Sequence, residues 1–193
     1  MTATDPRNLR NCLGHFASGV TVVTTSNPVG GAAEPHGATV NSFTSVSIDP
    51  PLVLVSLDRR SKLSRLLEDR PFVINILTAG QRDLALQFAG RPTPGLVVDW
   101  VEAPCGPRLA GSLAYISCSP WRRYDGGDHV LFLGQVEGFE FSGGEPLVFF
   151  RGEFQQVEGF PNTVFAPGDI LHTPGWGGET PLFLPRRLGA EVR

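Results

Sequence analysis

Residues 37–57, GATVNSFTSVSIDPPLVLVSL, decide the fold that the sequence predicts. Their β-branched and aromatic composition predicts two strands, over residues 38–47 and 52–57, separated by an Asp-Pro-Pro segment. Side chains alternate between the two faces of a strand, so the first strand carries polar groups such as Thr39 and Ser42 on opposite faces. Buried hydroxyls need hydrogen-bond partners. A polar ligand or a second subunit against one face explains this pattern, and so does an ordinary edge strand.

The rest of the chain adds short strands and few helices. Further strands are predicted over residues 20–25, 72–77, 114–119, 129–139 and 146–150. Apolar spacing predicts short helices over residues 8–18, 61–69 and 82–88, and the Pro and Gly of residues 26–36 predict an exposed loop. Because no regular alternation of strand and helix is present, a closed antiparallel barrel is favoured over a doubly wound fold.

Composition limits the function classes. A chain of 193 residues, 41% of them hydrophobic, fits a single domain with a sizeable core. The net charge of −3 gives no electrostatic basis for binding nucleic acid or an anionic membrane. The three cysteines follow no Cys-x-x-Cys spacing, and we predict no metal site. With neither a signal peptide nor a membrane span in the pattern, we expect a cytoplasmic protein.

Common catalytic motifs are missing as well. The sequence contains no Gly-x-Gly-x-x-Gly, Walker loop, His-Glu-x-x-His or Gly-x-Ser-x-Gly. The sequence therefore lacks the motifs that are typical of Rossmann-type dinucleotide binding, phosphoryl transfer, zinc hydrolysis and esterase chemistry.

Two further segments carry groups suited to a ligand. Residues 56–62, SLDRRSK, lead from a strand into a helix start with Ser61 as the predicted N-cap. Hydroxyls and cations at a helix start suit a phosphate, although an ordinary capped helix explains them too. Residues 124–129, YDGGDH, form a tight turn that ends in His129. This histidine can contact a ligand or serve the hairpin alone.

Five segments together resemble the flavin reductase family, the reductase components of two-component flavin-dependent monooxygenases. They are residues 8–25, 37–52, 72–77, 84–88 and 126–129. The resemblance spans about residues 8–157 in order, and the agreement of several separate motifs makes it specific.

The resemblance implies a mainly β fold, a six-stranded antiparallel Greek-key split barrel of the FMN-binding type with a few short flanking helices. It implies a homodimer that reduces FMN or FAD with NADH or NADPH and supplies the reduced flavin to a partner monooxygenase. Residues 1–157 would form the barrel domain, and the Pro- and Gly-rich residues 158–193 would form an extension packed on the dimer.

Site residues follow from the same resemblance. The segment that matches the contacts of the isoalloxazine and ribityl chain comprises Thr39, Val40, Asn41 and Ser42. The segment that matches the phosphate end comprises Ser56, Leu57, Ser61 and Lys62. A further flavin-contacting stretch is matched by Phe88 and Arg91. His129 matches the histidine near flavin and nicotinamide, and is both the expected catalytic residue and a cofactor contact. We expect the loss of His129 to impair NADH use more than flavin binding.

Two alternatives share the barrel. One is a non-enzymatic protein that binds or carries FMN, and the other is an oxidase that resembles pyridoxamine-phosphate oxidase. The oxidase needs a substrate phosphate site rich in Arg and Lys, and the Gly-Asp-His turn favours the reductase. The choices between FMN and FAD and between NADH and NADPH stay open.

Overall fold

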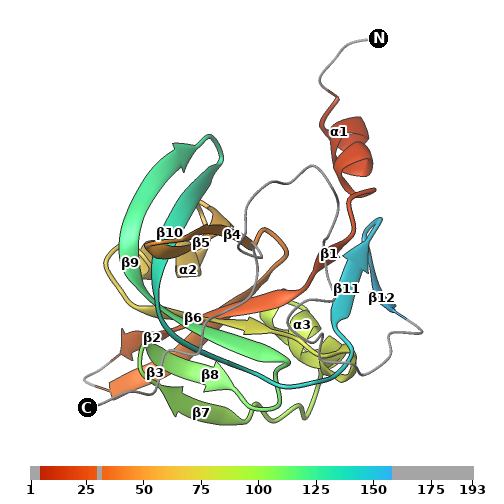
Figure 1. The fold of residues 1–193 in the computed structure, drawn as a ribbon. Helices are drawn as coiled ribbons and strands as arrows, with labels where there is room; N and C mark the ends of the chain where they lie inside the picture. Colours follow the sequence, from red (N-terminus) through yellow and green to blue (C-terminus); the bar gives the residue numbers. More distant parts are fainter. Residues whose placement is uncertain (1–4, 30–31, 158–193) are drawn as a thin grey trace, which may run out of the picture. The chain divides into compact units, whose positions relative to one another are not determined.

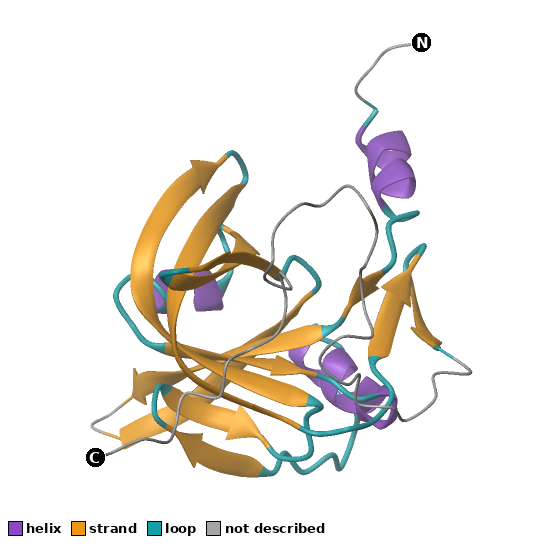
Figure 2. Ribbon diagram, viewed as in Figure 1, coloured by secondary structure: helices purple, strands orange, loops and turns teal. Residues whose placement is uncertain are grey.

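The computed structural model describes residues 5–29 and 32–157, so the predicted extension over residues 158–193 lies outside the described residues. Three antiparallel sheets and a few helices make up this part (Figures 1 and 2). The helices are α1 (Pro6–Leu13), α2 (Lys62–Leu66), the 3-10 turn η1 (Ala79–Gln81) and α3 (Arg82–Phe88). The strands are β1 (Ser18–Gly19), β2 (Thr21–Val29), β3 (Ala32–Val40), β4 (Thr44–Ile48), β5 (Pro51–Asp58), β6 (Phe72–Ile76), β7 (Trp100–Ala103), β8 (Gly106–Leu109), β9 (Ala114–Gly126), β10 (His129–Phe141), β11 (Leu147–Phe150) and β12 (Glu153–Gln156).

The main sheet has seven strands in the order β3-β2-β6-β9-β10-β5-β4. β3, at one end of this order, packs against β5, next to the other end, and the sheet thereby curls into a barrel (Figure 1). The barrel prediction is confirmed, but the strand count of six is wrong by one. The predicted strand over residues 38–47 breaks at residues 41–43 into β3 and β4, because Ser42 turns there to bond the backbone of β5.

The predicted loop over residues 26–36 is also wrong. β2 continues to Val29, β3 begins at Ala32, and Ser26 is paired with Pro35. Proline is tolerated here for two reasons. Pro35 lies on an edge strand, and Pro28 lies beyond Thr24, the last residue at which β2 pairs with β6.

The helices follow local capping signals. α3 has the predicted bounds, and the Ser61 side chain accepts a hydrogen bond from the Ser64 amide at 3.0 Å, as expected of the N-cap of α2. α1 begins earlier than predicted because Asp5 caps it and a proline occupies its first turn. It ends at Leu13, five residues before the predicted end at Ser18, with Gly14 as its C-cap.

The core consists of two clusters. In the first, Leu63 of α2 and its C-cap Leu67 pack against inward side chains of the barrel such as Val55, Leu57 and Phe132. The second includes Ala85 of α3, with Phe88 and Trp100 at its margin. None of the helices in the described residues is long and apolar enough to cross a membrane. α2 contacts β3 and β5, and α3 contacts β3, so these two helices lie against the strands that carry most of the predicted site residues.

Candidate functional site

The predicted site segments meet at the end of β5. In the β5–β10 ladder, His129 pairs with Asp58 and Leu131 pairs with Ser56. Side chains directly opposite one another lie on the same face of a sheet, so His129, Asp58 and Ser56 share one face. Leu57 lies on the other face and is buried in the core, with 3% of its side chain exposed. His129 therefore stands on the outer face of the barrel beside the end of β5.

His129 is oriented by its neighbour in the turn. Its Nδ1 lies 2.7 Å from a carboxylate oxygen of Asp128. An ionised carboxylate only accepts hydrogen bonds, so Nδ1 carries the proton and Nε2 is left for a ligand. This hydrogen bond is the main cause that lowers the pKa of Asp128, and hydrogen bonds from Arg60 lower the pKa of Asp58 to about 2. The imidazole is thus flanked by two carboxylates at neutral pH.

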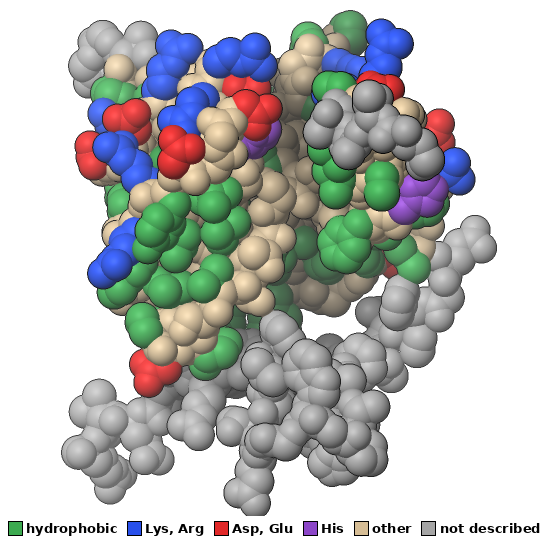
Figure 3. Space-filling view, turned by 90° about the horizontal axis from the view of Figure 1, so that it is seen from above, with side chains coloured by type: hydrophobic (Ala, Val, Ile, Leu, Met, Phe, Trp, Pro, Cys, Tyr) green, Lys and Arg blue, Asp and Glu red, His purple; other side chains and the backbone are tan. Residues whose placement is uncertain are grey.

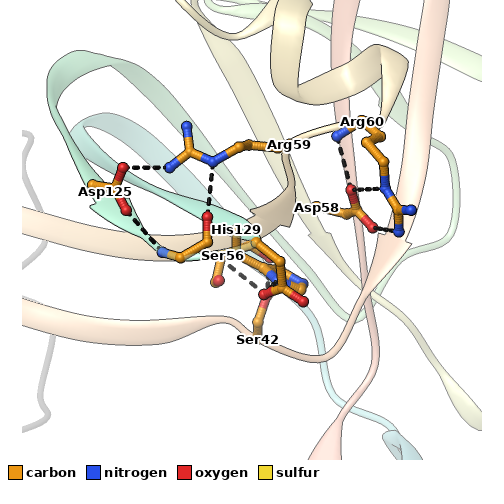
Figure 4. Close-up of polar contacts among 9 residues, drawn as sticks. Ser42, Ser56, Asp58, Arg59, Arg60, Asp125 and His129 are labelled. Carbon is orange, nitrogen blue, oxygen red and sulfur yellow. Dashed lines mark hydrogen bonds and ion pairs between the residues drawn. The ribbon is translucent and has the colours of Figure 1, made fainter.

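Arg59 ties the turn to the end of β5 (Figure 4). Its Nε donates to the Gly127 carbonyl at 2.8 Å and its guanidinium bonds Asp125 at 2.7 Å, while its own amide donates to the Asp128 carbonyl at 3.1 Å. The Gly127 amide donates to the other oxygen of Asp125 at 2.8 Å, and this bond, followed by the charge of Arg59, lowers the pKa of Asp125. A positive φ of 80° at Gly127 suits glycine in the turn. Arg59 thus holds the segment that carries His129.

We expect Arg59→Gln to raise KM about tenfold for a substrate that contacts His129, since a loosened turn misplaces that side chain, and to change kcat little. Steady-state kinetics with the nicotinamide substrate that the family resemblance implies measures this effect. Arg123→Gln is the matched control, because among the described residues Arg123 pairs with Glu68 alone, in a surface ion pair at 3.2 Å. Equal KM values for the two variants would contradict a positioning role for Arg59.

The bend at residues 41–43 is fixed by Ser42. Its hydroxyl donates to the Ser56 carbonyl at 2.7 Å and accepts from the Ser56 amide at 3.1 Å. Figure 4 shows this pairing of Ser42 with Ser56. The hydroxyl hydrogen of Ser42 is therefore already donated to another residue of the protein, whereas the neighbouring Asn41 is exposed. A ligand at this bend would meet the loop backbone and Asn41 rather than the Ser42 proton.

One face of β3, which carries Thr39, packs against α3. Thr39 donates its hydroxyl hydrogen to the Ala85 carbonyl at 2.7 Å, and Val40 packs on the first core cluster. A Cβ on Gly37 would lie 3.2 Å from the Phe88 ring, so glycine allows the close approach of β3 and α3. Thr39 and Phe88 lie together on the α3 side, and Arg91, which follows α3, is exposed.

The start of α2 carries the other predicted groups. The Ser61 hydroxyl accepts from the Ser64 amide and keeps its own hydrogen to donate. Lys62 is exposed, and no carboxylate within residues 5–29 and 32–157 pairs with it. A hydroxyl donor beside a free ammonium is a donor set that fits a phosphate.

The structure thus brings His129, Ser42, Ser56 and the start of α2 to one end of β5. It gives no direct contact between this group and the pair of Thr39 and Phe88. Sequence reasoning missed the roles of Arg59 and Asp125 because the register of the hairpin against β5 decides them. In the described part of the chain, no cluster of three or more His, Cys, Asp or Glu is placed to hold a metal ion.

Known proteins resemble this chain over most of its length. An NADH-dependent flavin reductase of Rhodococcus sp is 42% identical over 154 residues, which are 79% of this chain and 87% of that protein. The HsaB reductase subunit of a flavin-dependent monooxygenase from Rhodococcus jostii is 38% identical over 160 residues, 81% of this chain and 80% of that protein.

A solved structure shares the fold. It is the NADH:FAD oxidoreductase SgcE6 of Streptomyces globisporus C-1027 in complex with NAD and FAD fragments, with a TM-score of 0.71 and 37% identity over 86% of this chain and 96% of that one. Residues 13–158 match the family model described as flavin reductase like domain. The chain therefore belongs to the family of proteins with a flavin reductase like domain.

Proposed function

We propose that this chain uses NADH to reduce a free flavin, FMN or FAD, and supplies the reduced flavin to a partner monooxygenase. The observation that carries the proposal is the meeting of the His129 turn, the Ser42 bend and the start of α2 at the end of β5. Relatives named as an NADH-dependent flavin reductase and as a monooxygenase reductase subunit support both steps.

The donor set fits a phosphorylated flavin. Ser61 and Lys62 would hold the phosphate end, while the backbone at residues 41–43 would line the ring, with Ser42 keeping that bend in place. When bound, the flavin accepts a hydride from the nicotinamide and so supplies the redox chemistry. His129 would orient the nicotinamide carboxamide through Nε2, because Asp128 holds Nδ1. The protein would therefore act mainly by alignment.

The two alternatives predict other behaviour. A carrier protein would hold oxidised flavin tightly and consume no NADH. An oxidase acting on a phosphorylated amine would need a second cluster of Arg and Lys at the site. The names of the relatives support the reductase over both.

Steady-state oxidation of NADH and NADPH with added FMN or FAD tests the proposal. We expect NADH to be the better donor and the rate to be proportional to protein concentration. Retention of yellow flavin without NADH consumption would favour the carrier protein.

We infer that the protein is a homodimer, from the apolar side chains that the edge strand β4 exposes. Val46 and Ile48 of β4 are 47% and 65% exposed. Figure 3 shows apolar side chains gathered on one face beside a band of charged ones. An apolar edge strand is usually covered. A second copy of the chain would cover it.

We predict that the double substitution Val46→Arg and Ile48→Arg converts the dimer into a monomer. Two like charges placed on each side of a two-fold interface would repel, and dimer affinity should fall about 100-fold or more. Light scattering after size exclusion measures the mass. An unchanged dimer would place the interface on another face.

We also propose that residues 1–157 form the barrel domain and that residues 158–193 pack on the dimer. Limited proteolysis followed by mass measurement tests this division. Removal of residues 158–193 without any change in dimerisation or kinetics would contradict the packing.

A further inference from the structure

Residues 36–42 and 56–62 belong to neighbouring elements, because β3 contacts both β5 and α2. At one end, the Ser42 hydroxyl bonds both the amide and the carbonyl of Ser56. Six residues earlier in the first segment stands His36, and six residues later in the second stands Lys62. α2 packs against both β3 and β5, so the two segments stay together at this end as well. His36 and Lys62 thus close the far end of a strip that begins at Ser42 and Ser56.

The alternation of β3 decides where the His36 ring lies. His36, Ala38 and Val40 share one face of the strand, and Ala38 and Val40 pack on the core cluster that contains Leu63 of α2. The other face carries Thr39, which bonds α3. The His36 ring therefore lies on the α2 side of β3, at the end of the row and next to the first turn of that helix.

The surroundings of His36 are positive and only partly open. The side chain is half-buried, and its pKa is lowered first by burial and then by the nearby charge of Lys62. Across the described ranges, neither His36 nor Lys62 makes a side-chain hydrogen bond or an ion pair with a carboxylate. Two nitrogen donors on elements that pack together, β3 and the start of α2, and without an acid partner form a setting that an anion would complete.

We propose that His36 joins Lys62 in binding the phosphate of the flavin, as a residue that distinguishes phosphorylated flavins from riboflavin. This inference rests on the proposed function, because it takes the flavin to lie along the strip between Ser42 and Lys62. The isoalloxazine would lie at the Ser42 and His129 end, and the phosphate at the His36 end. An anion between the two side chains removes their repulsion and lets the imidazole donate.

Binding of FMN and of riboflavin to the His36→Gln variant tests the proposal. We expect the dissociation constant for FMN to rise about tenfold, the loss of one charge-assisted hydrogen bond, and that for riboflavin to stay within about twofold. Fluorescence titration of each flavin measures both constants in the full chain. His15→Gln is the matched control, since His15 is exposed and, within the described residues, its ring hydrogen-bonds the Asn11 carbonyl alone.

Riboflavin binding also reports whether the variant is folded. If FMN and riboflavin affinities fall together, His36 serves the structure and the proposal is overturned. If neither changes, the phosphate lies elsewhere and the proposal is overturned as well. Failure of the proposed function is a separate result, because the unmodified protein would then consume no NADH with either flavin.

Discussion

Replacing His129 with alanine is expected to lower kcat/KM for NADH about 100-fold, while the dissociation constant of the flavin changes less than about threefold. The side chain stands at the turn, with Nε2 free for a ligand and Nδ1 held by Asp128 at 2.7 Å. The proposed flavin contacts come from other segments, the bend at Ser42 and the start of α2. Loss of the imidazole should therefore affect the nicotinamide and spare the flavin.

Two measurements separate these effects. Steady-state kinetics with varied NADH gives kcat/KM, and fluorescence titration gives flavin affinity. The variant Asp128→Asn is the partner experiment, because it keeps the turn but weakens the hold on Nδ1, and an intermediate loss is expected. Equal loss of NADH use and flavin binding, or no loss of either, would contradict the assignment of His129.

The largest expected effect on stability is that of Gly134→Ala. A Cβ at this position in β10 would lie 2.6 Å from Cζ of Phe72 and 2.8 Å from Cβ of Cys118, both in the core. Such overpacking forces side chains and backbone to shift and costs about 2–3 kcal/mol. For a domain of this size, Tm should fall by about 4–12 °C.

Gly138→Ala in the same strand is the matched control. No atom lies within 4 Å of a Cβ built there, so its Tm should stay close to that of the unmodified protein. Thermal unfolding followed by circular dichroism measures both. If the two variants melt together, β10 does not pack against Phe72 and Cys118 as described.

The local structure could be predicted well from the sequence. The run PLVLVSLD became β5, and the bounds of α3 were predicted to the residue. Ser61 was identified as the cap of α2 because a serine before an apolar helix has a direct physical role there. The barrel followed from the number of short strands. These features depend on residues close together in the chain.

The errors concern contacts between distant residues. The strand predicted over residues 38–47 bends at Ser42 because its hydroxyl bonds Ser56, and composition cannot show that pairing. The ligand contact of Thr39 stays a prediction, and the register of β3 against α3 decides that its hydroxyl donates to the Ala85 carbonyl. The role of Arg59 depends on the register of the β9–β10 turn against β5. Each outcome is decided by tertiary packing and not by local pattern.

The central claim is that this chain reduces a free flavin and releases it. The most direct test mixes the purified protein with NADH and a large molar excess of FMN or FAD, without oxygen, and follows the absorbance of oxidised flavin. We predict that each protein molecule reduces many flavin molecules, seen as a loss of the absorbance of oxidised flavin. The flavin that is reduced at the higher rate, FMN or FAD, is the preferred one. Reduction that stops at one flavin per protein, or a bound flavin that neither NADH nor NADPH reduces, would contradict the claim.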